Sequence, residues 1–184
     1  ITIVRGHLDV LDHGDPADVR DTVALVDDEL DRMNRLVADL LLLTRADQTS
    51  FVTPVDTDVD ALTRSVFDKV TTLADREWVL EASATVHAPL DAQRLTQALL
   101  ALADNATHHT MPGSRVGIGS QLSDGDIRFW VTDSGPGIER DEQERIFERF
   151  ARGRNGTRRT EGAGLGLSIV TAIAQAHRWR VSVG

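Results

Sequence analysis

The first 47 residues carry apolar side chains at heptad spacing, and this feature most constrains the fold. The apolar positions form two runs that are separated by a short polar segment. The runs consist of Ile1, Val4, Leu8 and Leu11, and then Val19, Val23, Val26, Leu30, Met33, Val37 and Leu40. This spacing predicts two helices that share a coiled-coil-like seam.

The segment between the two runs has residues that end one helix and begin another. Gly14 suits a helix C-cap, Asp15 an N-cap and Pro16 the first helical position, so we expect an antiparallel hairpin. Further leucines widen the apolar face beyond one seam, at Leu36, Leu41 and Leu43. Two helices alone cannot enclose such a face, which favours a homodimeric four-helix bundle. The alternative is that the hairpin packs on the rest of its own chain.

The apolar spacing changes at residues 49–54, where polar residues, an aromatic residue and a proline interrupt the heptads. We therefore place a helical domain at 1–48 and a second domain at 49–184. In the second domain the patterns predict helices at 59–73, 90–106, 142–150 and 165–177, and strands at 78–80, 115–122, 127–132 and 180–183. Asp91 is the expected N-cap of the second helix, and 123–126 the turn of a hairpin. This order predicts an α+β sandwich in which helices cover one face of a single sheet.

Composition excludes several classes of function. The 184 residues include 20 Lys and Arg against 29 Asp and Glu, a formal charge of −9, so we expect no nucleic-acid partner. The absence of Cys excludes disulfides, thiolate catalysis and Cys-based zinc sites. Lys69 is the single lysine, so nucleotide chemistry here does without the lysine of a P-loop or a protein kinase. No apolar run approaches the ~20 residues that a membrane span needs.

Three segments carry residue types that suit a nucleotide site. Asn105 offers an amide oxygen to Mg²⁺, although an Asn in a helix is more often a cap or a surface residue. Asp133 follows a strand and can accept from an exocyclic amine, while Gly135 and Gly137 let the backbone approach a flat ring. The alternative there is a plain Gly-Pro turn. The glycines of 162–167 lead into a helix whose N-terminal amides can bind phosphate, and no strand precedes them as a dinucleotide fold requires.

Four segments, in this order, resemble the N, G1, F and G2 boxes of sensor histidine kinases. They are Asn105 and the ranges 133–138, 146–150 and 162–168. Residues 1–47 resemble the part of that family's dimerisation domain that follows the phosphoacceptor box. The resemblance implies a helical hairpin followed by an α/β sandwich of the Bergerat ATP-binding type, in the GHKL group of ATPases.

The resemblance also implies roles for individual residues. Asn105 resembles the Mg²⁺ ligand and Asp133 the acceptor for the adenine amine, with Gly135 and Gly137 shaping the adenine pocket. The ATP lid is expected to run from about residue 151 to 162. Further residues that the resemblance implies in nucleotide binding or in the lid are Phe147, Phe150, Arg152, Gly162, Gly164, Leu165 and Gly166.

The chain departs from the family pattern at three positions. Ala101 stands where the family often has Asn or another polar residue, four positions before Asn105. His108 and His109 replace the usual Lys and aromatic residue. A protonated His108 can donate to a phosphate, and His109 can stack on adenine. The adjacent histidines also suggest a metal site, but the sequence offers no third ligand.

The family's phosphoaccepting His is expected before Ile1, so no catalytic residue is assigned within this chain. His7 and His13 lack the pattern that follows that residue, and further strands of the sheet are expected after Val183. The resemblance implies the cytoplasmic core of a two-component sensor histidine kinase that binds ATP and Mg²⁺. The γ-phosphoryl group would pass to the upstream His and then to an Asp of a response-regulator receiver domain. The resemblance also implies a homodimer that forms through the hairpin. It further implies a full-length protein that is held in the plasma membrane by regions outside this chain.

Two other interpretations remain open. Ala101 and the two histidines suggest a degenerate kinase that serves as a dimeric nucleotide-binding scaffold. The second is another ATPase with the same fold, such as a topoisomerase, a mismatch-repair protein, a chaperone or an anti-sigma-factor kinase. The helical hairpin argues against this second group.

Overall fold

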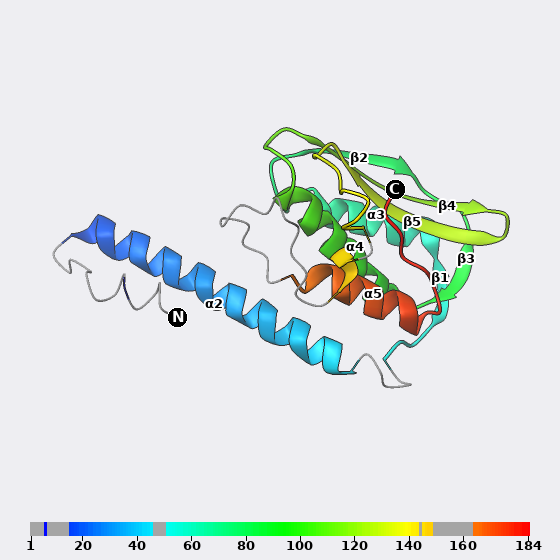
Figure 1. Cartoon of the computed structure of the whole chain (residues 1–184), viewed down its shortest axis with the longest axis horizontal. Helices are drawn as coiled ribbons and strands as arrows, with labels where there is room; N and C mark the ends of the chain where they lie inside the picture. The colour runs from blue at the N-terminus through cyan, green and yellow to red at the C-terminus, as the bar shows by residue number, and fades with distance from the viewer. Residues whose placement is uncertain (1–5, 7–14, 46–50, 144, 149–163) are drawn as a thin grey trace. The chain divides into compact units, whose positions relative to one another are not determined.

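The computed structural model of the chain describes residues 6, 15–45, 51–143, 145–148 and 164–184 (Figure 1). The chain divides into two compact units, Ile1–Leu41 and Leu42–Gly184. The predicted domain boundary between 48 and 49 stays a prediction, because it falls among residues 46–50, outside the described ones.

The helix α2 (Pro16–Arg45) begins where the sequence predicts. The backbone N–H of Ala17 donates to Asp15 Oδ1 at 2.8 Å, and that of Val19 donates to the Asp15 carbonyl at 3.1 Å. Asp15 is thus the N-cap and Pro16 the first helical residue, as expected. Of the first predicted helix only Gly6 is described, and it is helical. The cap at Gly14 and the hairpin pairing lie outside the described residues and stay predictions.

Apolar side chains of the predicted seam are exposed along α2. Val23, Leu30, Val37 and Leu40 are 53%, 51%, 56% and 52% exposed. Side chains of this kind at heptad spacing favour burial against another helix. The homodimeric four-helix bundle that would cover these side chains stays a prediction.

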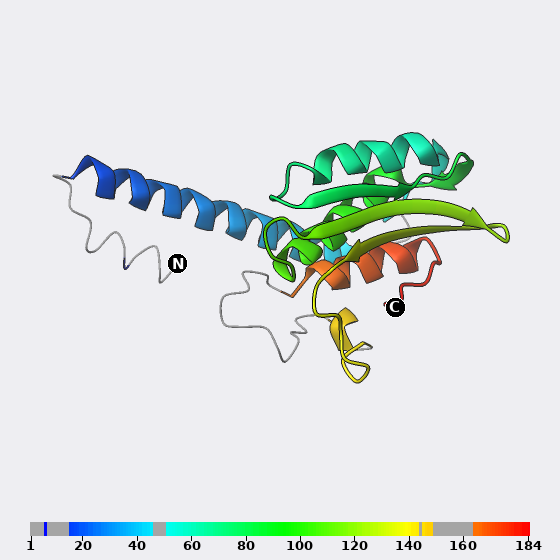
Figure 2. The same cartoon turned by 90° about the horizontal axis from the view of Figure 1, so that it is seen from above.

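The larger unit is built on a three-stranded sheet in the order β2-β4-β5. β2 (Glu77–Ala82) runs parallel to β4 (Arg115–Ser123), and β4 pairs antiparallel with β5 (Asp126–Asp133). Figure 2 shows β4 and β5 as one long hairpin. Its turn has φ of 53° at Asp124 and 87° at Gly125, which an Asp-Gly pair tolerates well. The hairpin and the strand at 78–80 are confirmed.

A second, two-stranded sheet pairs β1 (Val55–Asp58) antiparallel with β3 (His87–Leu90). The expectation of a single sheet was therefore wrong. Both strands have four residues, and their sequences, VDTD and HAPL, lack the alternation of apolar and polar residues that signals a strand. Their pairing comes from the neighbouring core, where Leu90 is 1% exposed.

Three helices cover one face of the three-stranded sheet, as expected (Figure 1). They are α3 (Val59–Val70), α4 (Ala92–His108) and α5 (Gly166–Ala176). The core between the layers is fully buried at Val59, Val66, Leu99 and Ile118. Burying such side chains contributes about 1.5–3 kcal/mol each, which makes this layer the main source of stability.

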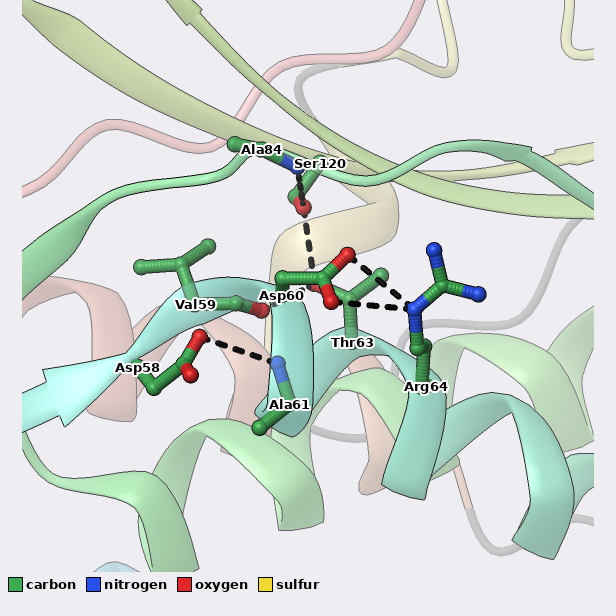
Figure 3. Close-up of polar contacts among 8 residues, drawn as sticks. All are labelled: Asp58, Val59, Asp60, Ala61, Thr63, Arg64, Ala84 and Ser120. Atoms are coloured by element: carbon green, nitrogen blue, oxygen red, sulfur yellow. Dashed lines mark hydrogen bonds and ion pairs between the residues drawn. The ribbon is translucent and has the colours of Figure 1, made fainter.

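A buried polar bridge joins α3 to β4 and to the segment after β2 (Figure 3). The Thr63 hydroxyl donates to the Val59 carbonyl at 2.7 Å and lies 2.7 Å from Ser120 Oγ. Because the single hydroxyl hydrogen of Thr63 is used, Ser120 donates to Thr63 and accepts from the Ala84 N–H at 3.0 Å. Each buried hydroxyl is thereby satisfied.

The outer side of α3 carries an exposed ion pair, also drawn in Figure 3. Arg64 Nε donates to both carboxylate oxygens of Asp60, at 3.1 and 3.0 Å. The Arg64 guanidinium lowers the pKa of Asp60. Exposed pairs of this kind add little stability because water screens them, which makes Arg64 a useful control for arginines with other roles.

A second set of polar contacts fastens residues 51–53 to the start of α4. Asp91, the N-cap as predicted, accepts from the Arg94 N–H at 3.0 Å and from the Thr53 N–H at 2.9 Å. Its own N–H donates to His177 Nε2 at 3.1 Å, and the Arg94 guanidinium lies 4.5 Å from the ring centre of Phe51. Partial burial raises the pKa of Asp91, but the backbone N–H groups and the Arg94 charge outweigh it and lower that pKa overall.

Two predicted elements differ from the structure. The helix expected at 142–150 is a short 3₁₀ helix, η1 (Arg145–Phe147), with 144, 149 and 150 outside the described residues. The strand expected at 180–183 is wrong, because those residues have no regular structure. The chain turns at Arg178, where φ is 61°, and Trp179 stacks on His177 at 4.5 Å, so the following residues pair with no strand in the described part of the chain.

Candidate functional site

The last turns of α4 carry side chains that we expected to meet a nucleotide. Asn105 is half-buried, and its amide has no hydrogen-bond partner among the described residues. Ala101 lies one helical turn before it and offers no polar atom from its side chain. The partly exposed Asn105 amide is therefore open to a ligand, with its oxygen as an acceptor.

His108 is partly engaged by its own helix. Its Nδ1 lies 2.8 Å from the Asp104 carbonyl oxygen and 3.7 Å from Asp104 Oδ2. A carbonyl oxygen only accepts, so Nδ1 carries the proton of this contact. The expected donation from His108 to a phosphate therefore falls to Nε2.

The loop after β5 closes against the end of α4. Asp133 is the last residue of β5, and its Oδ1 accepts from the Gly135 N–H at 2.7 Å. A Cβ added at Gly135 would lie 2.7 Å from the His109 carbonyl oxygen and 2.6 Å from Asp133 Oδ1. Only glycine allows this approach. Ser134 Oγ donates to the Arg115 carbonyl at 3.2 Å and fastens the loop to β4.

The start of α5 reaches the same end of α4. A Cβ built on Gly166 would come within 3.9 Å of the Ala101 carbonyl oxygen, one turn before Asn105. Gly164 has a φ of 70° and Gly137 one of 74°, a region that favours glycine. The structure thus gathers the three separate segments around the last turns of α4.

Several predicted residues are not placed. Phe150, Arg152 and Gly162 lie outside the described residues, so their roles and the lid stay predictions. Phe147 is half-buried in η1. Leu165 is 4% exposed and packs in the interior, and its predicted contact with a nucleotide stays a prediction.

The histidine pair gains no further ligand. Within the described ranges, no group of three or more His, Asp or Glu residues could hold a metal ion. His109 is exposed, and its backbone carbonyl, rather than its ring, makes the contact with the Gly135 loop. The amide of Asn105 is the better candidate for a divalent ion that also binds phosphate oxygens.

The sequence interpretation missed Arg76, which lies just before β2. Its guanidinium donates to the Thr107 carbonyl at 2.8 Å and to the Thr110 carbonyl at 3.0 Å, just beyond Asn105. An arginine in a turn between two elements has no periodicity that marks it. Only the folded chain reveals the contact.

Residues 90–184 match the family described as "Histidine kinase-, DNA gyrase B-, and HSP90-like ATPase". The chain belongs to this family. The match covers α4, the β4–β5 hairpin, the G1 loop and α5, which are the elements that build the site. The resemblance of the chain to sensor histidine kinases that carry this ATPase domain is confirmed.

Named relatives of this histidine kinase ATPase domain agree. The chain is 35% identical over 188 residues to "Probable sensor histidine kinase TcrY" of Mycobacterium tuberculosis, and it spans 40% of that protein's length. The crystal structure of full-length ShkA in complex with AMPPNP is 32% identical, with a TM-score of 0.74 over 90% of this chain and 35% of that one. The histidine kinase ThkA in complex with the response regulator TrrA, at 22% identity, shares the fold, with a TM-score of 0.66 over 84% of this chain and 48% of that one.

The described part of the chain contains no helix with the length and hydropathy that crossing a membrane requires.

Proposed function

We propose that this chain is the ATP-binding core of a two-component sensor histidine kinase, and that it binds ATP with Mg²⁺ at the end of α4. One observation carries the proposal. Gly135 packs on the His109 carbonyl while its N–H fixes Asp133 Oδ1, which joins two sequence-distant segments at one place. A plain surface turn needs no such approach between a loop and a helix end.

Asp133 would recognise the adenine. With Oδ1 engaged by Gly135, the other carboxylate oxygen has no hydrogen-bond partner among the described residues. A carboxylate oxygen is an acceptor only, so it selects a base with an exocyclic amine. His109 is exposed, and its ring can stack on the base that Asp133 would bind.

Asn105 would hold Mg²⁺ together with phosphate oxygens of the nucleotide. The donor set fits, because a neutral amide oxygen and phosphates supply hard oxygen ligands, and water can complete the coordination. When bound, the ion would neutralise part of the charge on the phosphates. The chain itself positions the nucleotide, and positioning with charge neutralisation is what phosphoryl transfer chiefly requires.

The transfer step would use the phosphoaccepting histidine that the resemblance places upstream of Ile1. The bond between the γ-phosphorus and the bridging oxygen breaks, a bond forms to a ring nitrogen of the upstream histidine, and ADP leaves. The unprotonated ring nitrogen would attack with its lone pair, and the histidine would release its ring proton to solvent water. The phosphoryl group would then pass to an aspartate of a response-regulator receiver domain.

The exposed seam of α2 supports the remaining part of the proposal. Leu30 and Val37, both more than half exposed, would be covered by a second copy of the chain in a four-helix bundle. The full-length protein would be a membrane sensor whose cytoplasmic portion contains this core.

A degenerate, dimeric nucleotide-binding scaffold is the second candidate. It is favoured by the absent polar side chain at Ala101 and by the contact of His108 Nδ1 with Asp104, which leaves one ring nitrogen for phosphate. Both candidates bind ATP, and they differ only in transfer.

Calorimetry with ATP and Mg²⁺ tests the site. Asp133→Asn should weaken ATP binding by at least about tenfold, since an amide in place of the carboxylate loses a charge-assisted hydrogen bond of roughly 1.5–3 kcal/mol. Asp126→Asn is the matched control, because Asp126 begins the same strand at its opposite end. Equal affinity in Asp133→Asn and Asp126→Asn would refute the proposed site.

A further inference from the structure

Arg76 makes an unusual set of contacts for an arginine in a turn. It is half-buried between α3 and β2, and no carboxylate pairs with it in the described part of the chain. Its Nε donates to Thr110 Oγ1 at 2.9 Å, its Nη2 to the Thr107 and Thr110 carbonyls at 2.8 and 3.0 Å, and its Nη1 to the Asp75 carbonyl at 2.6 Å. All its nitrogens therefore face backbone or hydroxyl oxygens.

Three of these four oxygens belong to Thr107, in the last turn of α4, and to Thr110, two residues beyond the end of the helix. The last carbonyls of a helix have no partners within the helix, and a positive charge there is favoured by the helix dipole. The Thr110 hydroxyl, which accepts from Arg76, donates in turn to the Ala106 carbonyl at 2.7 Å. The guanidinium thus holds the turn from Thr107 to Thr110 as one unit.

The same turn supports the loop that carries Asp133. His109 lies inside the turn, and its carbonyl oxygen is the atom against which Gly135 packs. Gly135 in turn donates to Asp133 Oδ1 at 2.7 Å. A continuous set of contacts therefore runs from Arg76 through the turn to the carboxylate.

We propose that Arg76 is a positioning residue for adenine recognition. By holding the Thr107–Thr110 turn, it places the His109 carbonyl that seats Gly135, and so it orients the Asp133 carboxylate toward the amine of the base. This inference rests on the proposed function of Asp133. Arg76 itself touches neither the base nor the phosphates in this account.

The test compares ATP with inosine triphosphate, which has an oxygen in place of the exocyclic amine. Arg76→Ala should raise the Kd of ATP about tenfold, the equivalent of about one well-made hydrogen bond, and change that of inosine triphosphate less than about twofold. Arg76→Lys should lie between wild type and Arg76→Ala, because one ammonium reaches fewer of the oxygens. Arg64→Gln is the matched control, since it removes an exposed guanidinium whose partner, Asp60, is outside the site.

The outcomes separate the inference from the proposed function. A wild-type chain that does not prefer ATP over inosine triphosphate overturns the role of Asp133 and the inference with it. If wild type prefers ATP and the Arg76→Ala variant keeps the same preference, the inference about Arg76 is overturned and the role of Asp133 stands. Equal weakening of both nucleotides with a lowered melting temperature would also overturn it, because Arg76 would then serve only the fold. If Arg76→Ala fails to fold, the same comparison is decided by Arg76→Lys.

Discussion

Removal of the Ser120 hydroxyl should destabilise the larger unit, and the structure allows the magnitude to be worked out. Ser120→Ala deletes the bond to Thr63 Oγ1 and leaves the buried Ala84 N–H without its acceptor, whereas Thr63 keeps its bond to Val59. Two lost hydrogen bonds of about 1 kcal/mol each, one leaving a buried donor unsatisfied, give about 2–3 kcal/mol. For a chain of this size that corresponds to a Tm lower by about 4–12 °C.

Urea denaturation of the full chain, followed by circular dichroism, measures this loss. Ser123→Ala is the matched control, because Ser123 ends the same strand and is exposed. In a double-mutant cycle with Thr63→Val, we expect a coupling energy of about 0.5–1.5 kcal/mol. The reasoning is refuted if Ser120→Ala stays within about 0.5 kcal/mol of wild type while Ser123→Ala does the same.

Two further predictions concern the contacts at Asp91 and the seam of α2. The folded-state pKa of Asp91 is lowered, so the stability that its carboxylate contributes is present above the unfolded pKa of about 3.9 and is lost as pH falls below that value. The difference in unfolding free energy between wild type and Asp91→Asn should therefore shrink below about pH 4. A difference that does not change with pH contradicts this prediction. Leu30→Asp should yield monomers by light scattering, because it buries an unpaired charge in the bundle. The control Asp28→Asn, at an exposed position of α2, should keep the assembly of wild type, and a strictly monomeric wild type counts against the bundle.

Much of the fold follows from local patterns. The Asp-Gly turn predicts the β4–β5 hairpin, and the caps at Asp15 and Asp91 predict where α2 and α4 begin. The two short strands were missed because their pairing depends on the surrounding core rather than on their own sequence. The prediction of a strand after Arg178 was wrong for a related reason. An alternating sequence forms a strand only where a neighbouring strand can pair with it.

The site was predicted less directly. Asn105 and Asp133 each have ordinary explanations when taken alone, and the resemblance of four ordered segments brought them together. The approach of Gly135 to the His109 carbonyl shows that the two segments meet, which no spacing along the chain determines. Arg76 had no sequence signal, because its role comes from carbonyl groups that any residue can supply.

Transfer of a labelled γ-phosphoryl group tests the central claim most directly. The assay uses the natural chain extended upstream of Ile1 through the expected phosphoacceptor, incubated with γ-labelled ATP and Mg²⁺. We expect an acid-labile, base-stable phosphohistidine on the extended chain and no label on the 184-residue chain alone. An extended chain that binds ATP yet never becomes labelled, while Ala101→Asn combined with His108→Lys restores labelling, would contradict the kinase assignment and establish the scaffold instead.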